Sequence, residues 1–216
     1  MIKAIIFDLD GVIVSTDEYH FRAWQELARF LNLPFSHDDN ARQRGVSRME
    51  SLEVLLEKSQ YPYNAEEKQY LADKKNDLYR KLLAELSPEE ILPGAMEFAR
   101  EARDAGLKIA VGSSSRNTPF ILRKIGLSDY FDAVADGNDI ERSKPDPQVF
   151  QIAAQRVGCA PAACLVIEDA DAGVEAAKAA AMHALAVGAA EHHRQADIGA
   201  PSLKDLSLEA VLAKLN

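Results

Sequence analysis

The chain begins with Ile2-Lys3-Ala4-Ile5-Ile6-Phe7-Asp8-Leu9-Asp10-Gly11-Val12, and this stretch decides the expected fold. Its first half is apolar and rich in β-branched side chains, which is typical of a buried parallel strand. Asp8 and Asp10 then follow two residues apart, where the strand gives way to a glycine turn. Because side chains alternate along an extended backbone, the two carboxylates are expected to point the same way.

This carboxylate pair has two interpretations. At the carboxyl end of a buried strand, burial raises the pKa of at least one carboxylate unless a cation lies nearby. Such a pair suits a nucleophile and a general acid/base beside a divalent metal. The same Asp-x-Asp spacing also occurs in plain turns and surface pairs, so other parts of the chain have to decide.

The composition excludes several classes of protein. The 216 residues are 47% hydrophobic, enough for a sizeable core in one domain that carries an insertion. The formal net charge of -9 argues against a nucleic-acid or membrane-surface binder, which would need a basic face. The two cysteines, Cys159 and Cys164, lack metal spacing and are expected to be reduced thiols.

The expected location follows from the N-terminus and from hydropathy. The first residues resemble a strand rather than a signal peptide, and no apolar run reaches about 18 residues. We therefore expect a soluble, cytoplasmic protein with no nucleic-acid or membrane partner, and we expect it to be a monomer.

A polar, helix-patterned block follows the first strand. Helices are predicted at Thr16–Asn32, Ser47–Ser59 and Ala65–Leu86, with Thr16, Ser47 and Asn64 as N-caps. A block this long is not a simple connection. We predict an all-helical cap domain at residues 16–92, inserted into a core made of residues 1–15 and 93–216. Two chain crossings would allow a hinge, and closure would exclude water from an enclosed site.

Strands and helices alternate after Pro93-Gly94. Strands are predicted at Lys108–Val111, Ala133–Ala135, Cys164–Ile167 and His183–Val187, and helices at Ala95–Ala105, Asn117–Ile125, Asp146–Val157, Ala172–Ala181 and Ser207–Leu215. This alternation predicts an α/β fold, a Rossmann-like doubly wound parallel sheet with helices on both faces.

Polar residues follow the first four predicted strands, beginning with Asp8 and Asp10, and ligands bind beyond the carboxyl ends of open parallel sheets. The second strand is followed by Ser113-Ser114-Ser115, the loop after the third carries Lys144-Pro145, and Glu168-Asp169 follows the fourth. Singly, these could be a polar turn, a solvated lysine and a helix cap. Together they favour a metal-bound phosphate, because serine hydroxyls and a lysine suit phosphate oxygens and carboxylates suit Mg²⁺.

On these motifs the chain resembles the phosphotransferases of the haloacid dehalogenase superfamily. The resemblance implies that Asp8 attacks phosphorus in line and forms an aspartyl-phosphate. It implies that Asp10 protonates the leaving oxygen and later deprotonates the incoming one. Mg²⁺ would be held by Asp8, Asp169 and the Asp10 carbonyl oxygen, with Glu168 in support. Ser113 and Lys144 would neutralise the transferring phosphoryl group.

The helical block bears on what accepts the phosphoryl group: water in a phosphatase, or a sugar hydroxyl in a mutase. A mutase that works through a bisphosphate has to hold a second, distal phosphate. Gly45-Val46-Ser47-Arg48 places an arginine near a helix start, which favours anions. Lys74-Lys75-Asn76 and Ser115-Arg116-Asn117 offer further polar groups.

With Tyr19-His20-Phe21-Arg22-Ala23-Trp24, these stretches resemble the β-phosphoglucomutase subfamily. The resemblance implies that Arg48, Ser115 and Asn117 bind the distal phosphate. Lys75 would contact the sugar, and His20 would lie near the hinge beside Asp10 and Lys75. The full expected substrate-binding set is Thr16, His20, Trp24, Gly45, Arg48, Lys75, Ser115, Arg116 and Asn117. Ser15 stands where the subfamily usually has an aspartate, which leaves the behaviour of the hinge open.

Less specific interpretations remain for single residues of this set. Arg48 could be a solvated helix residue, Trp24 part of the cap interior, and His20 a structural histidine. The expected reaction interconverts β-D-glucose 1-phosphate and glucose 6-phosphate through a bisphosphate. The alternative is a sugar-phosphate phosphatase of the same superfamily with the same aspartate nucleophile.

Overall fold

The computed structural model describes residues 1–43 and 45–215; residues 44 and 216, which the predicted cap and core ranges include, lie outside the described residues. The chain forms two compact units. One consists of Met1–Ser15 and Ser87–Asn216, and the other of Thr16–Leu86. The first is referred to as the sheet unit and the second as the helical unit.

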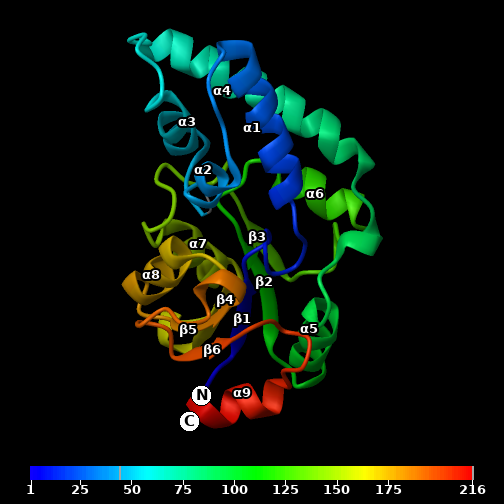
Figure 1. Cartoon of the computed structure of the whole chain (residues 1–216). Coiled ribbons are helices and arrows are strands. Elements are labelled where there is room, and N and C mark those ends of the chain that lie inside the picture. Colours follow the sequence, from blue (N-terminus) through cyan, green and yellow to red (C-terminus); the bar gives the residue numbers. More distant parts are fainter. Residues whose placement is uncertain (44, 216) are drawn as a thin grey trace. The chain divides into compact units, whose positions relative to one another are not determined.

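The sheet unit contains a six-stranded parallel sheet in the order β3-β2-β1-β4-β5-β6 (Figure 1). The strands are β1 (Ala4–Phe7), β2 (Lys108–Gly112), β3 (Ala133–Ala135), β4 (Cys164–Glu168), β5 (His183–Val187) and β6 (Ile198–Ala200). From β1 the chain builds β2 and β3 on one side, then crosses to β4 on the other. The predicted doubly wound fold is confirmed, and its switch point lies between β1 and β4.

Helices cover both faces of this sheet. They are α5 (Ala95–Asp104), α6 (Thr118–Lys124), α7 (Gln148–Arg156), α8 (Asp171–Ala179) and α9 (Leu208–Leu215), with 3-10 turns η2 (Pro88–Glu90), η3 (Pro161–Ala163) and η4 (Gly188–Ala190). On one face Ile6 and Val166 pack with Phe150 of α7 and Val174 of α8. On the other, Phe7 meets Phe98 of α5 edge-on, with ring centroids 6.4 Å apart. Burial from both sides explains why β1 is a continuous apolar run.

The helical unit consists of α1 (Asp17–Leu31), α2 (His37–Ala41), α3 (Arg48–Leu56), α4 (Ala65–Leu82) and the 3-10 turn η1 (Leu83–Glu85). Its interior is formed by Trp24, Leu27, Leu52 and Leu71, contributed by α1, α3 and α4. None of the helices in the described part of the chain is long and apolar enough to cross a membrane.

Two of the three predicted N-caps are confirmed. Ser47 and Asn64 each form a capping box, with Glu50 and Glu67 respectively. Thr16 precedes α1 but its side chain makes no capping bond. Its buried hydroxyl instead accepts a hydrogen bond of 2.9 Å from the Tyr79 hydroxyl of α4, which ties the start of α1 to α4.

Two short elements were not predicted, α2 and β6. The five residues of α2 are mostly polar and have no apolar period, although Ser36 and Asp39 form a capping box at their start. The three residues of β6 are Ile198, Gly199 and Ala200, too few for a periodicity to show. β6 lies at the edge of the sheet and carries none of the predicted site residues.

Candidate active site

Three acidic side chains gather at the switch point of the sheet. Asp8 follows β1, while Glu168 ends β4 and Asp169 follows it. β1 and β4 are paired in register, and the Asp8 N–H continues the ladder by donating to the Ile167 carbonyl at 2.9 Å. One carboxylate oxygen from each acidic residue lies within 4.8 Å of the other two. The structure thus brings the first predicted motif, with Asp8, close to the last, Glu168-Asp169.

Lys144 joins the third motif to this cluster. Its side chain is 2% exposed, and its Nζ lies 2.5 Å from Asp8 Oδ1 and also donates to Glu168 Oε1. The ammonium lies 4.6 Å from the centroid of the Phe150 ring. Burial alone would lower the pKa of Lys144, but the charges of Asp8 and Glu168 outweigh that effect and raise it. Lys144 therefore stays charged beside the carboxylate expected to react.

The cluster has the charge and the donor atoms that suit a divalent cation. Burial raises the pKa of both Glu168 and Asp169, and for Asp169 the charges of Glu168, Asp8 and Asp10 add to the rise. If all three carboxylates are ionised, their negative charge exceeds the single positive charge of Lys144. A hard cation such as Mg²⁺, which prefers oxygen ligands, fits this donor set.

Glu168 is fixed from two sides. One oxygen accepts from Lys144, and the other accepts the backbone N–H groups of Asp169 and Ala170, each at 2.9 Å. The carboxylate of Glu168 is therefore oriented by its neighbours, while its role in support of a metal stays a prediction.

Asp10 lies two residues after Asp8, in the turn that follows β1. Its backbone forms a bridge with Val14, and the Gly11 N–H donates to the Val14 carbonyl at 2.8 Å. Among the described residues, the close carboxylate group contains Asp8, Glu168 and Asp169 but not Asp10. Asp10 is near enough to raise the pKa of Asp169. Its role as acid and base stays a prediction.

Two glycines that were given no site role make room for the acidic cluster. A Cβ on Gly11 would lie 2.1 Å from Asp169 Oδ2, and Gly11 has a φ of +85°. A Cβ on Gly173 would lie 1.9 Å from the Glu168 carboxyl carbon. In the sequence, only their places after Asp10 and after Glu168-Asp169 could have indicated these two glycines.

The predicted serine loop, residues 113–117, lies beyond β2, the neighbour of β1. The buried Ser113 accepts the Ser115 N–H at its Oγ, at 3.2 Å, and Ser115 Oγ accepts the Asn117 N–H at 3.2 Å. Since each hydroxyl still has its own O–H to donate, the loop keeps donors suited to phosphate oxygens. The Arg116 Nε donates to the Gly137 carbonyl at 3.2 Å, so part of its guanidinium serves the loop itself.

In the helical unit, Lys75 and His20 are in direct contact. Lys75 Nζ lies 2.8 Å from His20 Nδ1. Because an ammonium group only donates, Nδ1 accepts and the imidazole carries its proton on Nε2. Burial, followed by the charges of Lys75 and Arg48, holds the pKa of His20 well below its usual value. His20 is therefore a neutral, oriented side chain.

The aromatic surroundings of Lys75 were not predicted. Lys75 is 2% exposed, and its Nζ lies 4.7 Å from the Trp24 ring centroid and 4.6 Å from that of Tyr79. Trp24 is buried in the core of the unit, which agrees with its interpretation as part of the interior. Tyr79 was missed, although its spacing of four residues from Lys75 on one helix could have indicated the contact.

Arg48, at the start of α3, contacts α4. It donates to Asn76 Oδ1 at 2.9 Å and lies 3.6 Å from Asp73 Oδ1, with a quarter of its side chain exposed. Gly45, in the turn before α3, has a φ of +74°, which favours glycine. A contact of any of these residues with a substrate stays a prediction.

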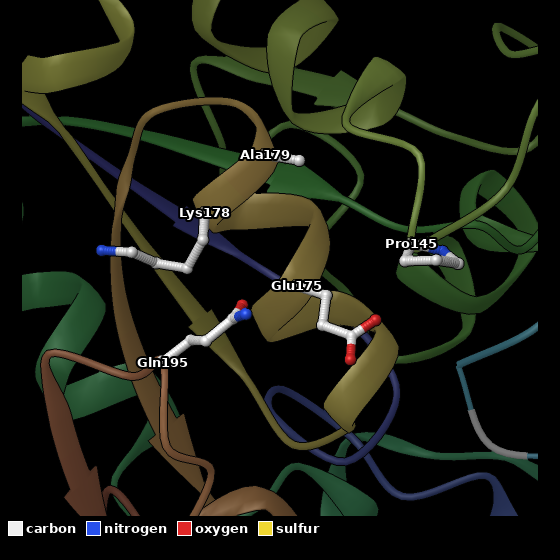
Figure 2. A pocket seen from close by; sticks show the side chains of 5 residues that line it. All are labelled: Pro145, Glu175, Lys178, Ala179 and Gln195. Carbon is white, nitrogen blue, oxygen red and sulfur yellow. The ribbon is translucent and has the colours of Figure 1, made fainter.

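A shallow pocket of about 690 Å³ lies beside α8 in the sheet unit. Figure 2 shows its lining residues, Pro145, Glu175, Lys178, Ala179 and Gln195. Of these, Lys178 forms an ion pair with Asp197, with 2.8 Å between Nζ and Oδ2. The pocket includes no predicted site residue, although Pro145 directly follows Lys144.

Comparison with known proteins shows the family of the chain. The family model for haloacid dehalogenase-like hydrolases matches residues 2–181. The chain is 43% identical over 209 residues to β-phosphoglucomutase of Bacillus subtilis, covering 96% of this chain and 92% of that protein. It is 32% identical over 183 residues to fructose-1-phosphate phosphatase of Escherichia coli, covering 85% and 95%. The crystal structure of β-phosphoglucomutase from Clostridium difficile matches with a TM-score of 0.94 and 37% identity, over 100% of this chain and 98% of that one.

Proposed function

The chain belongs to the haloacid dehalogenase-like hydrolase family, and we propose that it is a Mg²⁺-dependent β-phosphoglucomutase. It interconverts β-D-glucose 1-phosphate and glucose 6-phosphate through a bisphosphate. The contact of Lys144 with Asp8 inside the acidic cluster carries the phosphoryl-transfer part of this proposal. The identity of 43% to a mutase over nearly the whole chain supports the choice of reaction.

Asp8 is the proposed nucleophile. Its carboxylate oxygen attacks phosphorus, the bond from phosphorus to the leaving oxygen breaks, and an aspartyl-phosphate forms while Asp10 gives its proton to the leaving oxygen. In the second half, Asp10 takes the proton of the incoming sugar hydroxyl, which attacks phosphorus and releases Asp8. The covalent intermediate divides one difficult transfer into two steps. Lys144 and Ser113 offset the charge of the transferring group.

The metal would be held by Asp8, Asp169 and the Asp10 carbonyl oxygen, with Glu168 in support. When bound, Mg²⁺ neutralises charge on the phosphoryl oxygens and helps to orient them. The backbone N–H groups of Asp169 and Ala170 hold the Glu168 carboxylate in place for this role.

A bisphosphate carries a second phosphate, for which we propose Ser115, Asn117 and Arg48 as ligands. Lys75 is the proposed contact to the sugar, oriented by the neutral His20. Thr16, fixed by Tyr79, marks the boundary of the helical unit, whose role as a mobile cap is likewise a proposal.

A sugar-phosphate phosphatase is the second candidate, favoured by the similarity to fructose-1-phosphate phosphatase. The two functions differ in product. With Mg²⁺, β-D-glucose 1-phosphate and a trace of glucose 1,6-bisphosphate, we expect glucose 6-phosphate to form with little inorganic phosphate. Both products are measured in the same reaction, with Asp8→Asn as the blank. Quantitative release of inorganic phosphate would refute the mutase and favour the phosphatase.

A further inference from the structure

The turn that follows β3, Asp136–Asp139, is bonded to the serine loop by three hydrogen bonds. The Gly137 N–H donates to the Ser115 carbonyl at 3.2 Å, and the Gly137 carbonyl accepts from Arg116 Nε at 3.2 Å. Asn138 Nδ2 donates to the Arg116 carbonyl at 3.1 Å. These contacts join the ends of two neighbouring strands, and all three fall on residues 115 and 116.

The turn is itself held firmly. The buried Asp136 accepts, at one carboxylate oxygen, both the backbone N–H and the side-chain Nδ2 of Asn138, at 2.7 and 2.8 Å. The Asp136 N–H donates to Asp139 Oδ2 at 2.9 Å. Arg156 of α7 binds both oxygens of Asp139, at 2.8 and 2.6 Å. Side chains of this kind fix turns by local hydrogen bonds, and here the turn is also anchored to a helix.

Gly137 brings the turn and the loop into direct contact. A Cβ at this position would lie 2.4 Å from the Ser114 carbonyl oxygen and 2.7 Å from the Arg116 nitrogen. The φ of Gly137 is outside the left-handed region, so its own backbone would accept alanine. An added methyl group would therefore clash with the loop backbone, and the contact between turn and loop would have to shift.

The two halves of the loop are supported differently. The Ser113 N–H donates to the Ala135 carbonyl at 3.1 Å and so continues the pairing of β2 with β3. Residues 115–116 make no such strand pairing; besides the bond to Ser113 Oγ and the bond from the Thr118 hydroxyl to the Ser115 carbonyl, they are held by the turn. Ser113 is expected at the transferring phosphoryl group, whereas Ser115 and Asn117 are the proposed ligands of the distal phosphate.

We propose that the turn Asp136–Asp139 is a positioning element for the distal-phosphate half of the serine loop, acting through Gly137 and Asn138. It holds Ser115 and Asn117 in place before substrate binds, so that no binding energy is spent on ordering them. This inference rests on the proposed function, because it assumes a ligand with two phosphates.

The test measures binding without turnover, in the Asp8→Asn background with Mg²⁺. Gly137→Ala and Asn138→Ala are each titrated with glucose 1,6-bisphosphate and with phenyl phosphate, which has one phosphate only. We expect Kd for the bisphosphate to rise by about tenfold in both variants, and Kd for phenyl phosphate to change by less than about twofold. A residue of merely structural importance would not separate the two ligands.

Asp132→Ala is the matched control. Asp132 lies just before β3, at the end away from the turn, and accepts hydrogen bonds from the Ile109 N–H and Lys108 Nζ. It should leave both Kd values within about twofold. Thermal melting of each variant checks folding, and Asn138→Ala decides the matter if Gly137→Ala does not fold.

Unchanged bisphosphate affinity, equal losses for both ligands, or the same selectivity in Asp132→Ala would each overturn the inference. The same holds if the Asp8→Asn parent does not bind the bisphosphate. Failure of the proposed function is seen separately, as inorganic phosphate released by the wild type in the product assay.

Discussion

Each unit contains a lysine that is 2% exposed, and the contacts described for the two lysines differ. Lys144 lies against the carboxylates of Asp8 and Glu168. Lys75 lies against a neutral imidazole nitrogen and the faces of Trp24 and Tyr79. The carboxylates raise the pKa of Lys144, whereas the charge of Lys75 helps to lower the pKa of His20.

The contrast separates two uses of buried charge. In the sheet unit, a cation offsets acidic groups placed where phosphorus is expected to react. In the helical unit, a cation keeps a neighbour uncharged and so fixes its tautomer. We therefore expect phosphoryl transfer to take place around Lys144, and the residues around Lys75 to orient the substrate. The following experiments test this division, from the largest expected effect to the smallest.

Asp8→Asn is expected to have the largest effect on activity. Asparagine keeps the shape and an oxygen that can accept from Lys144, but it does not attack phosphorus. We expect turnover to fall by at least about 10⁴-fold, with little change in the melting temperature. A coupled assay for glucose 6-phosphate measures the first quantity and circular dichroism the second. Asp132→Asn makes the same change outside the site and should retain activity; an active Asp8→Asn would refute the nucleophile.

Lys144→Met and Lys75→Met compare the two lysines directly. Without Lys144 two buried carboxylates lose their cation, and we expect the free energy of unfolding to fall by about 3–5 kcal/mol in metal-free buffer. For Lys75→Met we expect about 1 kcal/mol, because the methionine thioether can still pack against the rings of Trp24 and Tyr79. Urea unfolding measures both, and the single tryptophan, Trp24, reports on the helical unit by fluorescence. Equal losses would contradict the contrast.

Arg48→Ala tests whether the helical unit selects the substrate. We expect the mutase rate to fall by about 10- to 100-fold, since a charged ligand of the distal phosphate is lost. Hydrolysis of phenyl phosphate should change by less than about threefold. Arg42→Ala removes an arginine of the same unit that is half exposed and paired with Glu57, and it should change neither rate. Equal losses in both reactions for Arg48→Ala would exclude a distal-phosphate role.

The smallest expected effect is the pH dependence set by His20. Its pKa is lower in the folded protein than in the unfolded chain, so the unfolded chain takes up the proton first as pH falls. Stability should therefore decrease below about pH 6.5, by about 1 kcal/mol between pH 7 and 5.5. His20→Gln should reduce this slope in urea unfolding followed by Trp24 fluorescence. His192→Gln, which alters a side chain 91% exposed, should leave it unchanged.

The residues at strand ends were predictable because both signals are local. A buried parallel strand is a continuous apolar run, and the first polar residues after it mark its carboxyl end. This was enough to assign Asp8, Ser113, Glu168 and Asp169 to the carboxyl ends of the strands, where the structure places them. Lys144 was assigned to the same site because it lies in the loop after β3, but its direct bonds to Asp8 and Glu168 could not be derived, because they depend on the path of that loop.

Contacts between side chains of different helices were less predictable. Thr16 has the residue type and position of an N-cap, yet its hydroxyl bonds to Tyr79, 63 residues away. The turn at Asp136–Asp139 has the composition of an ordinary turn, and its bonds to the serine loop depend on the pairing of β2 with β3. α2 and β6 are too short for any period to identify them.

Gly11 and Gly173 have a consequence for how related sequences are sorted. Each lacks the Cβ that would collide with a carboxylate of the cluster: Asp169 lies against Gly11, and Glu168 lies against Gly173. A chain could keep every acidic residue and the lysine of this site and still lose it through one added methyl group. Searches for active members of the family among uncharacterised genomes should therefore require these two glycines as strictly as the carboxylates. A chain with the charged motifs but a larger residue at either position is expected to bind Mg²⁺ weakly, which isothermal titration would show.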